Sequence, residues 1–173
     1  MRHVTVTMTA HDIGPETAYE RIRDFRSYPD VTDTVREVVV HPPDADGGVV
    51  SDWTVRFRNG LMRWSERDTF APESLIVSFT QLRGDFEEFE GRWRCAPAGR
   101  GTTVTFEAVF DLGIPTLAEL LDPVAEATLR SNIELIAGGL LGRVTVEPAA
   151  PAGSPAVPGA SLAEAGAPAA AHG

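Results

Sequence analysis

The sequence contains little cysteine, no lysine and no long apolar run. Cys95 is the single cysteine among 173 residues, so no intrachain disulfide can form and no multi-cysteine metal site can be built. We expect it to be an inert, buried side chain. No stretch approaches the ~18 consecutive apolar residues of a membrane-spanning helix, and the N-terminal residues alternate in polarity instead of forming the apolar run of a signal peptide. These absences predict a soluble, cytoplasmic protein.

Positive charge is also scarce. The 15 basic residues are all arginine, against 25 acidic residues, and the net charge is -10. Because nucleic-acid binding depends on attraction to phosphate, DNA and RNA are not expected partners. No metal site is expected either, since the four histidines lack metal-ligand spacing; they are His3, His11, His41 and His172.

The expected organisation is one folded domain followed by a tail. A hydrophobic content of 43% supports one well-buried domain, which we place at residues 1–146. Residues 147–173 are rich in Ala, Pro and Gly and cannot bury enough surface to fold, so we predict a disordered tail.

Alternating and helical apolar patterns predict the elements of this domain. Gly14 and Pro15 mark the start of a first helix, and a second short helix covers residues 30–34. A capping box of Thr116 and Glu119 opens a long last helix, which Pro123 is expected to kink. Short linkers between the strands favour an antiparallel meander. The strands are expected at residues 4–8, 35–41, 75–82, 86–95 and 102–110, with a hairpin of two more between residues 51 and 70.

The hairpin places two carboxylates on its apolar face. Asn59-Gly60 indicates a type I′ turn, which pairs Trp53 with Glu66 and Ser51 with Asp68. Both carboxylates then point inward, two residues apart and about 7 Å apart at the backbone. Because burying an unpaired carboxylate costs several kcal/mol, the space they face is interpreted as a wet or ligand-filled cavity. The alternative is that they lie near the sheet edge and pair with an arginine.

Further side chains are predicted to face the same space. A three-residue loop with a bulge after the strand at 75–82 puts Phe79 and Gln81 on one face with Phe89 and Trp93. On the last helix, the apolar stripe contains two polar residues, Thr128 and Asn132; it is formed by Leu117, Leu121, Val124, Thr128, Asn132 and Leu135. The alternatives are ordinary core packing for Trp53, Trp64 and Trp93, and backbone-satisfied side chains for Thr128 and Asn132.

This order of elements resembles the helix-grip fold of the START-like (SRPBCC) superfamily, over residues 4 to about 144. The likeness is closest to the polyketide cyclase/dehydrase (aromatase/cyclase) and Coq10-like branch. It implies an α+β domain in which a curved antiparallel seven-stranded sheet wraps a long C-terminal helix around an internal cavity. The spans that carry it are Tyr28-Pro29, Trp64-Ser65-Glu66-Arg67-Asp68, Gly84-Asp85-Phe86, Gly91-Arg92-Trp93 and the residues 110–115 before the last helix.

The resemblance implies cofactor-independent aldol cyclisation and dehydration of a poly-carbonyl compound. That chemistry needs a base and an acid, and Glu66 with Asp68 are the candidate catalytic pair. Where the aromatase/cyclases tend to carry a hydroxyl residue and an arginine, this chain has the two carboxylates, so the chemistry cannot simply be transferred. The expected ligand-binding residues are Trp53, Trp64, Phe79, Gln81, Phe89, Trp93, Thr128 and Asn132.

The same fold also serves functions other than catalysis. The main alternative is a non-catalytic carrier or sequestering protein for a quinone, lipid or polyketide. A ribosome-targeting toxin of the same fold suits such an acidic chain poorly.

The outer face of the hairpin offers a further contact surface. There, Arg56 is expected opposite Arg63, with Arg58 and Arg67 nearby, which would suit an acidic acyl carrier protein. The alternative is pairing of these arginines with Asp52 and other surface carboxylates. A second copy of the chain, in a homodimer, is the other candidate partner.

Overall fold

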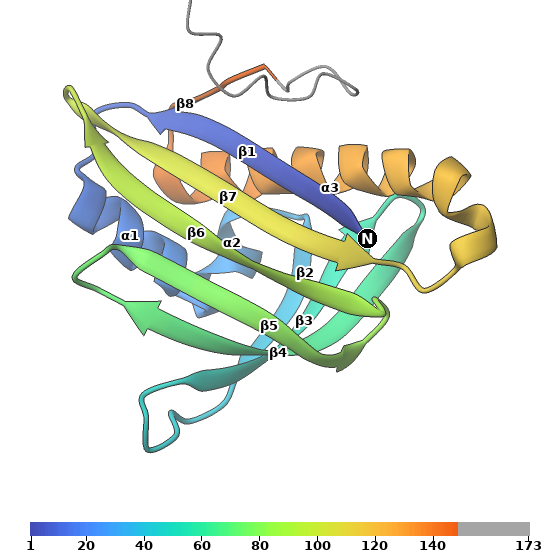
Figure 1. Cartoon of the computed structure of the whole chain (residues 1–173). Coiled ribbons are helices and arrows are strands. Elements are labelled where there is room, and N and C mark those ends of the chain that lie inside the picture. Colours follow the sequence, from blue (N-terminus) through green and yellow to red (C-terminus); the bar gives the residue numbers. More distant parts are fainter. Residues whose placement is uncertain (149–173) are drawn as a thin grey trace, which may run out of the picture.

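The computed structural model describes residues 1–148, which form one α+β domain (Figure 1). The predicted tail therefore lies, apart from its first two residues, outside the described residues. The predicted order of elements is confirmed, with a short strand added at the end. The elements are β1 (Arg2–Ala10), α1 (Pro15–Arg23), α2 (Tyr28–Val31), β2 (Val35–Val40), β3 (Val49–Phe57), β4 (Gly60–Ala71), β5 (Ile76–Gly84), β6 (Glu88–Ala98), β7 (Gly101–Asp111), α3 (Ala118–Leu141) and β8 (Val144–Val146), with 3₁₀ turns at Phe25–Ser27 and Pro115–Leu117.

All the strands belong to one antiparallel sheet in the order β2-β3-β4-β5-β6-β7-β1-β8. The sheet therefore has eight strands, and the prediction of seven was wrong. The additional strand, β8, pairs with β1 at Met8, Thr9 and Ala10 and covers a sheet edge that would otherwise be open there. Figure 1 shows the sheet curving around α3, which lies across its concave side, as in the predicted helix-grip fold.

The long helix α3 packs on the sheet through a different face from the predicted one. Its buried residues are Ala125, Leu129, Ile133, Ile136, Ala137, Leu140 and Leu141. Most lie one position after a residue of the predicted stripe, which corresponds to a rotation of ~100° around the helix. Leu117 and Leu135, which belonged to the predicted stripe, are 45% and 55% exposed. No helix among residues 1–148 is long and apolar enough to cross a membrane.

The helix starts also differ from the prediction. The second helix covers Tyr28–Val31 rather than residues 30–34, because Pro29 is tolerated in a first helical turn, where its missing N–H is not needed. The capping box at Thr116 is absent. Thr116 lies inside a 3₁₀ turn, and α3 begins after Leu117 with no side-chain cap.

The hairpin of β3 and β4 turns one residue earlier than predicted. Arg58 and Asn59 form the loop, and Arg58 rather than Gly60 has a positive φ, of 58°. Trp53 therefore lies opposite Trp64 instead of Glu66, and the two rings stack at 6.2 Å. Each β3 residue lies opposite a β4 residue two positions earlier than predicted. Because side chains alternate between the two faces of a strand, this even shift leaves every side chain on its predicted face.

Candidate functional site

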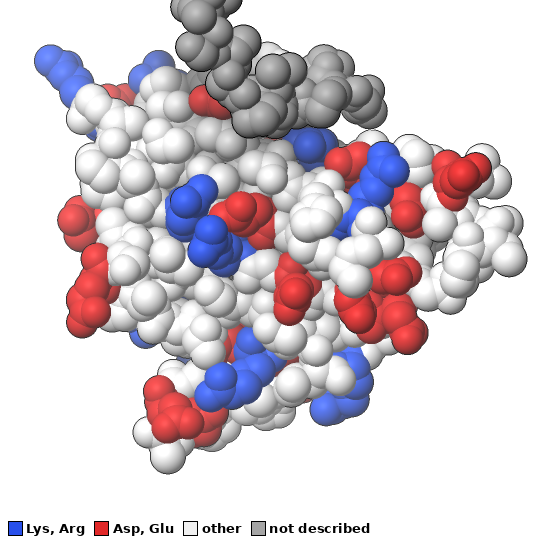
Figure 2. Space-filling model, viewed as in Figure 1, with Lys and Arg blue, Asp and Glu red and all other residues white. Residues whose placement is uncertain are grey.

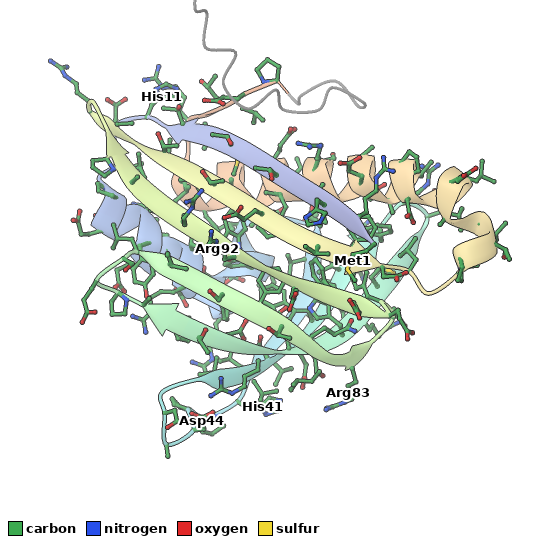
Figure 3. The ribbon with its side chains drawn as sticks, viewed as in Figure 1. Met1, His11, His41, Asp44, Arg83 and Arg92 are labelled. Carbon is green, nitrogen blue, oxygen red and sulfur yellow. The ribbon has the colours of Figure 1, made fainter. Side chains whose placement is uncertain are left out.

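A small cavity lies between the concave face of the sheet and α3. Its volume is about 70 Å³, below the ~300–1,000 Å³ of typical ligand pockets. Aromatic rings from several strands and from the segment after α1 form most of its wall, and side chains of both layers fill the surrounding space (Figure 3). Glu66 and Asp68 are its charged lining residues within the described part of the chain.

Most of the predicted site residues lie around this cavity. Besides the two carboxylates, the lining includes Trp53, Trp64, Phe79, Phe89, Trp93 and Asn132. Gln81 and Thr128 do not line it. The Gln81 amide donates to the Phe86 carbonyl at 2.9 Å, and the Thr128 hydroxyl donates to the Val124 carbonyl at 3.0 Å on the outer side of α3. The rotation of α3 explains the error at Thr128.

The paired strands β4 and β5 hold the two carboxylates inside the domain. Glu66 is 5% exposed and Asp68 is fully buried, so neither lies at a sheet edge. Next to Glu66, β5 contains one extra residue, Leu82, which projects outward and is 51% exposed. A bulge of this kind redirects neighbouring side chains and is common beside functional sites. Beyond it, Gly84 has a φ of 150° and packs so closely on Trp64 that a Cβ would lie 2.4 Å from the Trp64 Cβ.

A chain of hydrogen bonds fixes both carboxyl groups. The Trp53 indole N–H donates to Ser51 Oγ at 2.8 Å, and the Ser51 hydroxyl donates to Asp68 Oδ2 at 2.5 Å. The Trp64 indole N–H donates to Glu66 Oε2 at 2.7 Å. Asp68 Oδ1 is buried without a donor among the described residues unless Glu66 carries a proton. The contacts therefore favour a pair in which a protonated Glu66 donates to an ionised Asp68.

The electrostatics of the pair agree with this assignment. Burial raises the pKa of Glu66 well above its usual range, and the adjacent Asp68 charge and a hydrogen bond to Asp68 raise it further. Burial also raises the pKa of Asp68, to about 6, although hydrogen bonds from Glu66 and Ser51 oppose that shift. No arginine pairs with either group within residues 1–148. At neutral pH the pair thus holds one proton and one negative charge.

Several lining residues were not identified from the sequence as site residues. Phe57, Phe86 and Tyr28 lie in the cavity wall, and the Tyr28 hydroxyl donates to the Ile22 carbonyl at 2.6 Å. The Tyr28 hydroxyl proton is therefore engaged in that hydrogen bond. Burial raises the pKa of Tyr28 well above its usual value, so the Tyr28 side chain stays neutral. Alternation in the sequence places only Phe57 inside, because Tyr28 lies in α2 and Phe86 lies in the loop between β5 and β6, where the strand pattern gives no face.

Other polar groups lie on the outside of the domain. His41, on the outer side in Figure 3, is 2.7 Å from Asp52, which also accepts a hydrogen bond from Ser65. The predicted opposition of Arg56 and Arg63 is wrong, because the shifted register puts Arg56 opposite Leu61. Figure 2 shows acidic and basic side chains mixed over the visible face.

Buried Cys95 agrees with the prediction of an inert thiol. Burial raises its pKa to about 12.

Known structures share this architecture. TTHA0849 from Thermus thermophilus is 25% identical, with a TM-score of 0.72 over 80% of this chain and 94% of that one. The Zhui aromatase/cyclase from Streptomyces sp. R1128 is 19% identical, with a TM-score of 0.66 over 82% and 92%. A START superfamily protein from Mycobacterium smegmatis is 18% identical, with a TM-score of 0.68 over 80% and 96%. These similarities agree with the helix-grip fold.

The sequence itself identifies the family. No curated protein matches this chain. Residues 12–136, however, match the family model for polyketide cyclase/dehydrase and lipid transport proteins, a span that runs from the loop before α1 into α3 and includes both carboxylates. This chain therefore belongs to the polyketide cyclase/dehydrase and lipid transport family.

Proposed function

We propose that this protein catalyses aldol cyclisation and dehydration of an apolar, poly-carbonyl compound of the polyketide type, without a cofactor. The observation that carries the proposal is the buried pair of Glu66 and Asp68, which faces the cavity with no basic partner among residues 1–148. At neutral pH the pair offers a carboxylate and a carboxylic acid side by side. General acid–base catalysis of this reaction needs that combination.

The proposed cycle returns the pair to its starting state. The Asp68 carboxylate removes a proton from a carbon next to one carbonyl, and the resulting enolate attacks the carbon of a second carbonyl. Glu66 gives its proton to the oxygen of that second carbonyl, which becomes a hydroxyl group. The Glu66 carboxylate then removes a second proton from the first carbon, and Asp68 protonates the departing hydroxyl group, which leaves as water. A carbon–carbon double bond forms and both residues regain their initial protonation.

The cavity must enlarge before it can hold such a substrate. A volume of about 70 Å³ admits a small ring or a few water molecules but not an elongated chain. The tight packing of aromatic rings around this cavity also favours the main alternative, a carrier that opens around its ligand and performs no chemistry. Under that alternative, Glu66 and Asp68 orient the ligand through hydrogen bonds.

Single amide substitutions separate catalysis from carrying. With 1-indanone as probe, the exchange of its α-protons in D₂O is followed by NMR, and binding is followed by tryptophan fluorescence. We expect wild-type protein to accelerate exchange, and Glu66→Gln and Asp68→Asn each to reduce it by about 10²-fold or more while affinity stays within about threefold.

The matched control is Asp52→Asn. Asp52 lies on the neighbouring strand of the same hairpin but contacts His41 and Ser65 on the outside, so its substitution should leave exchange unchanged. If wild-type protein binds 1-indanone without accelerating exchange, the catalytic proposal fails and the carrier function stands. If Asp52→Asn lowers exchange as much as Asp68→Asn does, the assignment to the buried pair is wrong.

A further inference from the structure

A second hollow shares a wall with the interior cavity. It is a groove between the tip of the β3–β4 hairpin and the outer side of α3, two segments that lie next to each other in Figure 1. Its volume is about 550 Å³, and its lining includes Arg58, Val124, Thr128 and Asn132. Asn132 also lines the interior cavity. The side chain of this one residue therefore borders both spaces.

A single hydrogen bond holds Asn132 against the hairpin. Its amide Nδ2 donates to the Arg56 carbonyl at the hairpin tip at 2.8 Å, and this bond is exposed to solvent. A hydrogen bond of this kind contributes only ~0.5–1.5 kcal/mol. Movement of this side chain would remove a wall that the two spaces share, so that the cavity of about 70 Å³ could continue into the groove of about 550 Å³.

The groove is apolar along α3 and positively charged at its tip. Its lining along the helix includes Pro123, Val124 and Ala127. The Thr128 hydroxyl donates a hydrogen bond to the Val124 carbonyl within the helix and so is not a free donor toward the groove. Arg58 adds an exposed guanidinium that forms no ion pair within residues 1–148. The interior carries the opposite charge, because Asp68 is ionised at neutral pH. A ligand that spans both spaces must therefore keep any anionic group outside.

The geometry points to an elongated ligand that carries an anionic group at one end. Its apolar body passes Asn132 into the cavity, and its anionic end stays in the groove and pairs with Arg58. This inference deepens the proposed function and rests on it only for the presence of a ligand in the cavity. It assigns the groove as a second subsite and Asn132 as the boundary between the two.

Two fluorescent probes with nearly the same apolar body test the role of Arg58. One is the anionic 1-anilinonaphthalene-8-sulfonate and the other is the neutral N-phenyl-1-naphthylamine. We expect Arg58→Gln to weaken binding of the sulfonate about two- to fivefold, as for a solvent-exposed ion pair, and to leave the neutral probe unchanged. The control Arg100→Gln, in the exposed turn between β6 and β7, should affect neither probe. Equal effects of the two substitutions, or equal effects on the two probes, would overturn the inference.

Association kinetics test the boundary residue. Asn132→Ala removes both the hydrogen bond and most of the side chain, so stopped-flow mixing should show both probes associating several-fold faster. Glu134→Ala, at an exposed position of the same helix, is the matched control. Asn132→Ser replaces the alanine variant if circular dichroism shows that it does not fold. Unchanged association in the folded variant would show that ligands do not pass this residue.

Competition against the sulfonate probe identifies the anionic group. Decanoate and decyl phosphate carry the same chain with different ends, and decanol is the neutral reference. Stronger competition by either anion supports the inference and names its source, whereas competition equal to that of decanol refutes it. These binding readouts do not depend on turnover. If the protein does not accelerate proton exchange but still prefers the anionic probe through Arg58, only the catalytic proposal is refuted.

Discussion

Replacing Asp68 with asparagine should change how stability depends on pH. Burial raises the pKa of this carboxyl group from 3.8 to about 6. Between these values the unfolded chain releases the proton while the folded protein keeps it, so the free energy of unfolding falls as pH rises. Below pH ~4 both states are protonated and no stability is lost. Above pH ~6 both states are ionised and the loss of stability is complete. Asparagine cannot ionise and removes this dependence.

The size of the effect follows from the pKa difference. A rise of about two units at ~1.4 kcal/mol per unit gives about 3 kcal/mol of stability lost at neutral pH because Asp68 ionises. Asp68→Asn also lowers the pKa of Glu66 by removing the adjacent charge, which acts in the same direction. The unfolding free energy of the variant relative to wild type should therefore increase by about 3 kcal/mol between pH 4 and pH 7.

Urea unfolding of both proteins, followed by far-UV circular dichroism at half-unit steps from pH 4 to pH 8, measures this difference. Asp52→Asn supplies a control whose stability difference from wild type should stay nearly constant over this range. A hydrogen bond from Ser65 lowers the pKa of Asp52 from 3.8, so its ionised form stabilises the protein throughout the range, and this stabilisation is lost only below about pH 4. A difference between wild type and Asp68→Asn that stays constant across the whole range would refute the electrostatic account of the pair.

Two further predictions concern the helix and the outer surface. Gly138→Ala should stabilise the protein by about 0.5–1 kcal/mol in urea unfolding, because alanine favours helix and nothing lies near the added Cβ. Gly139→Ala should instead destabilise it by about 1–3 kcal/mol, because the added Cβ would lie 2.4 Å from the Val31 carbonyl oxygen. Equal effects of the two substitutions would contradict this packing. Reversing Arg56 and Arg63 to glutamate tests whether an acidic acyl carrier protein docks on the outer face of the hairpin: if it does, calorimetry should show weaker binding, and unchanged affinity would exclude this docking surface.

The β3–β4 hairpin shows what could be predicted from local sequence. Alternation fixes which face each side chain takes, and it correctly placed Glu66, Asp68 and Trp53 inside. The turn itself could not be predicted from Asn59-Gly60. Stacking of Trp53 on Trp64 requires the observed register, and that contact depends on tertiary packing. A shift by an even number of residues changes the partners but preserves the faces, so the inward face of this hairpin was predicted correctly despite the wrong register.

The last helix shows where prediction from periodicity fails. Apolar residues occur on several sides of α3, and Leu120 is 69% exposed. A stripe that starts from Leu117 is out of phase, because that residue lies in the 3₁₀ turn before the helix. The observed orientation of the helix takes Thr128 out of the interior but leaves Asn132 at its border, where it contacts the hairpin. The missing information was the position of the helix axis relative to the sheet, which only the assembled fold supplies.

The energetic cost of the carboxyl pair is itself an argument for its function. Most buried charges in proteins are paired, and an unpaired acidic pair among aromatic rings lowers stability at neutral pH. The surrounding chain does not relieve that cost with an arginine, although its surface carries several. Instead, Ser51 and Trp64 hold each carboxyl group in a fixed orientation toward the cavity. Such an arrangement weakens the fold and orders two titratable groups, which is the pattern expected where a site must exchange protons with a ligand.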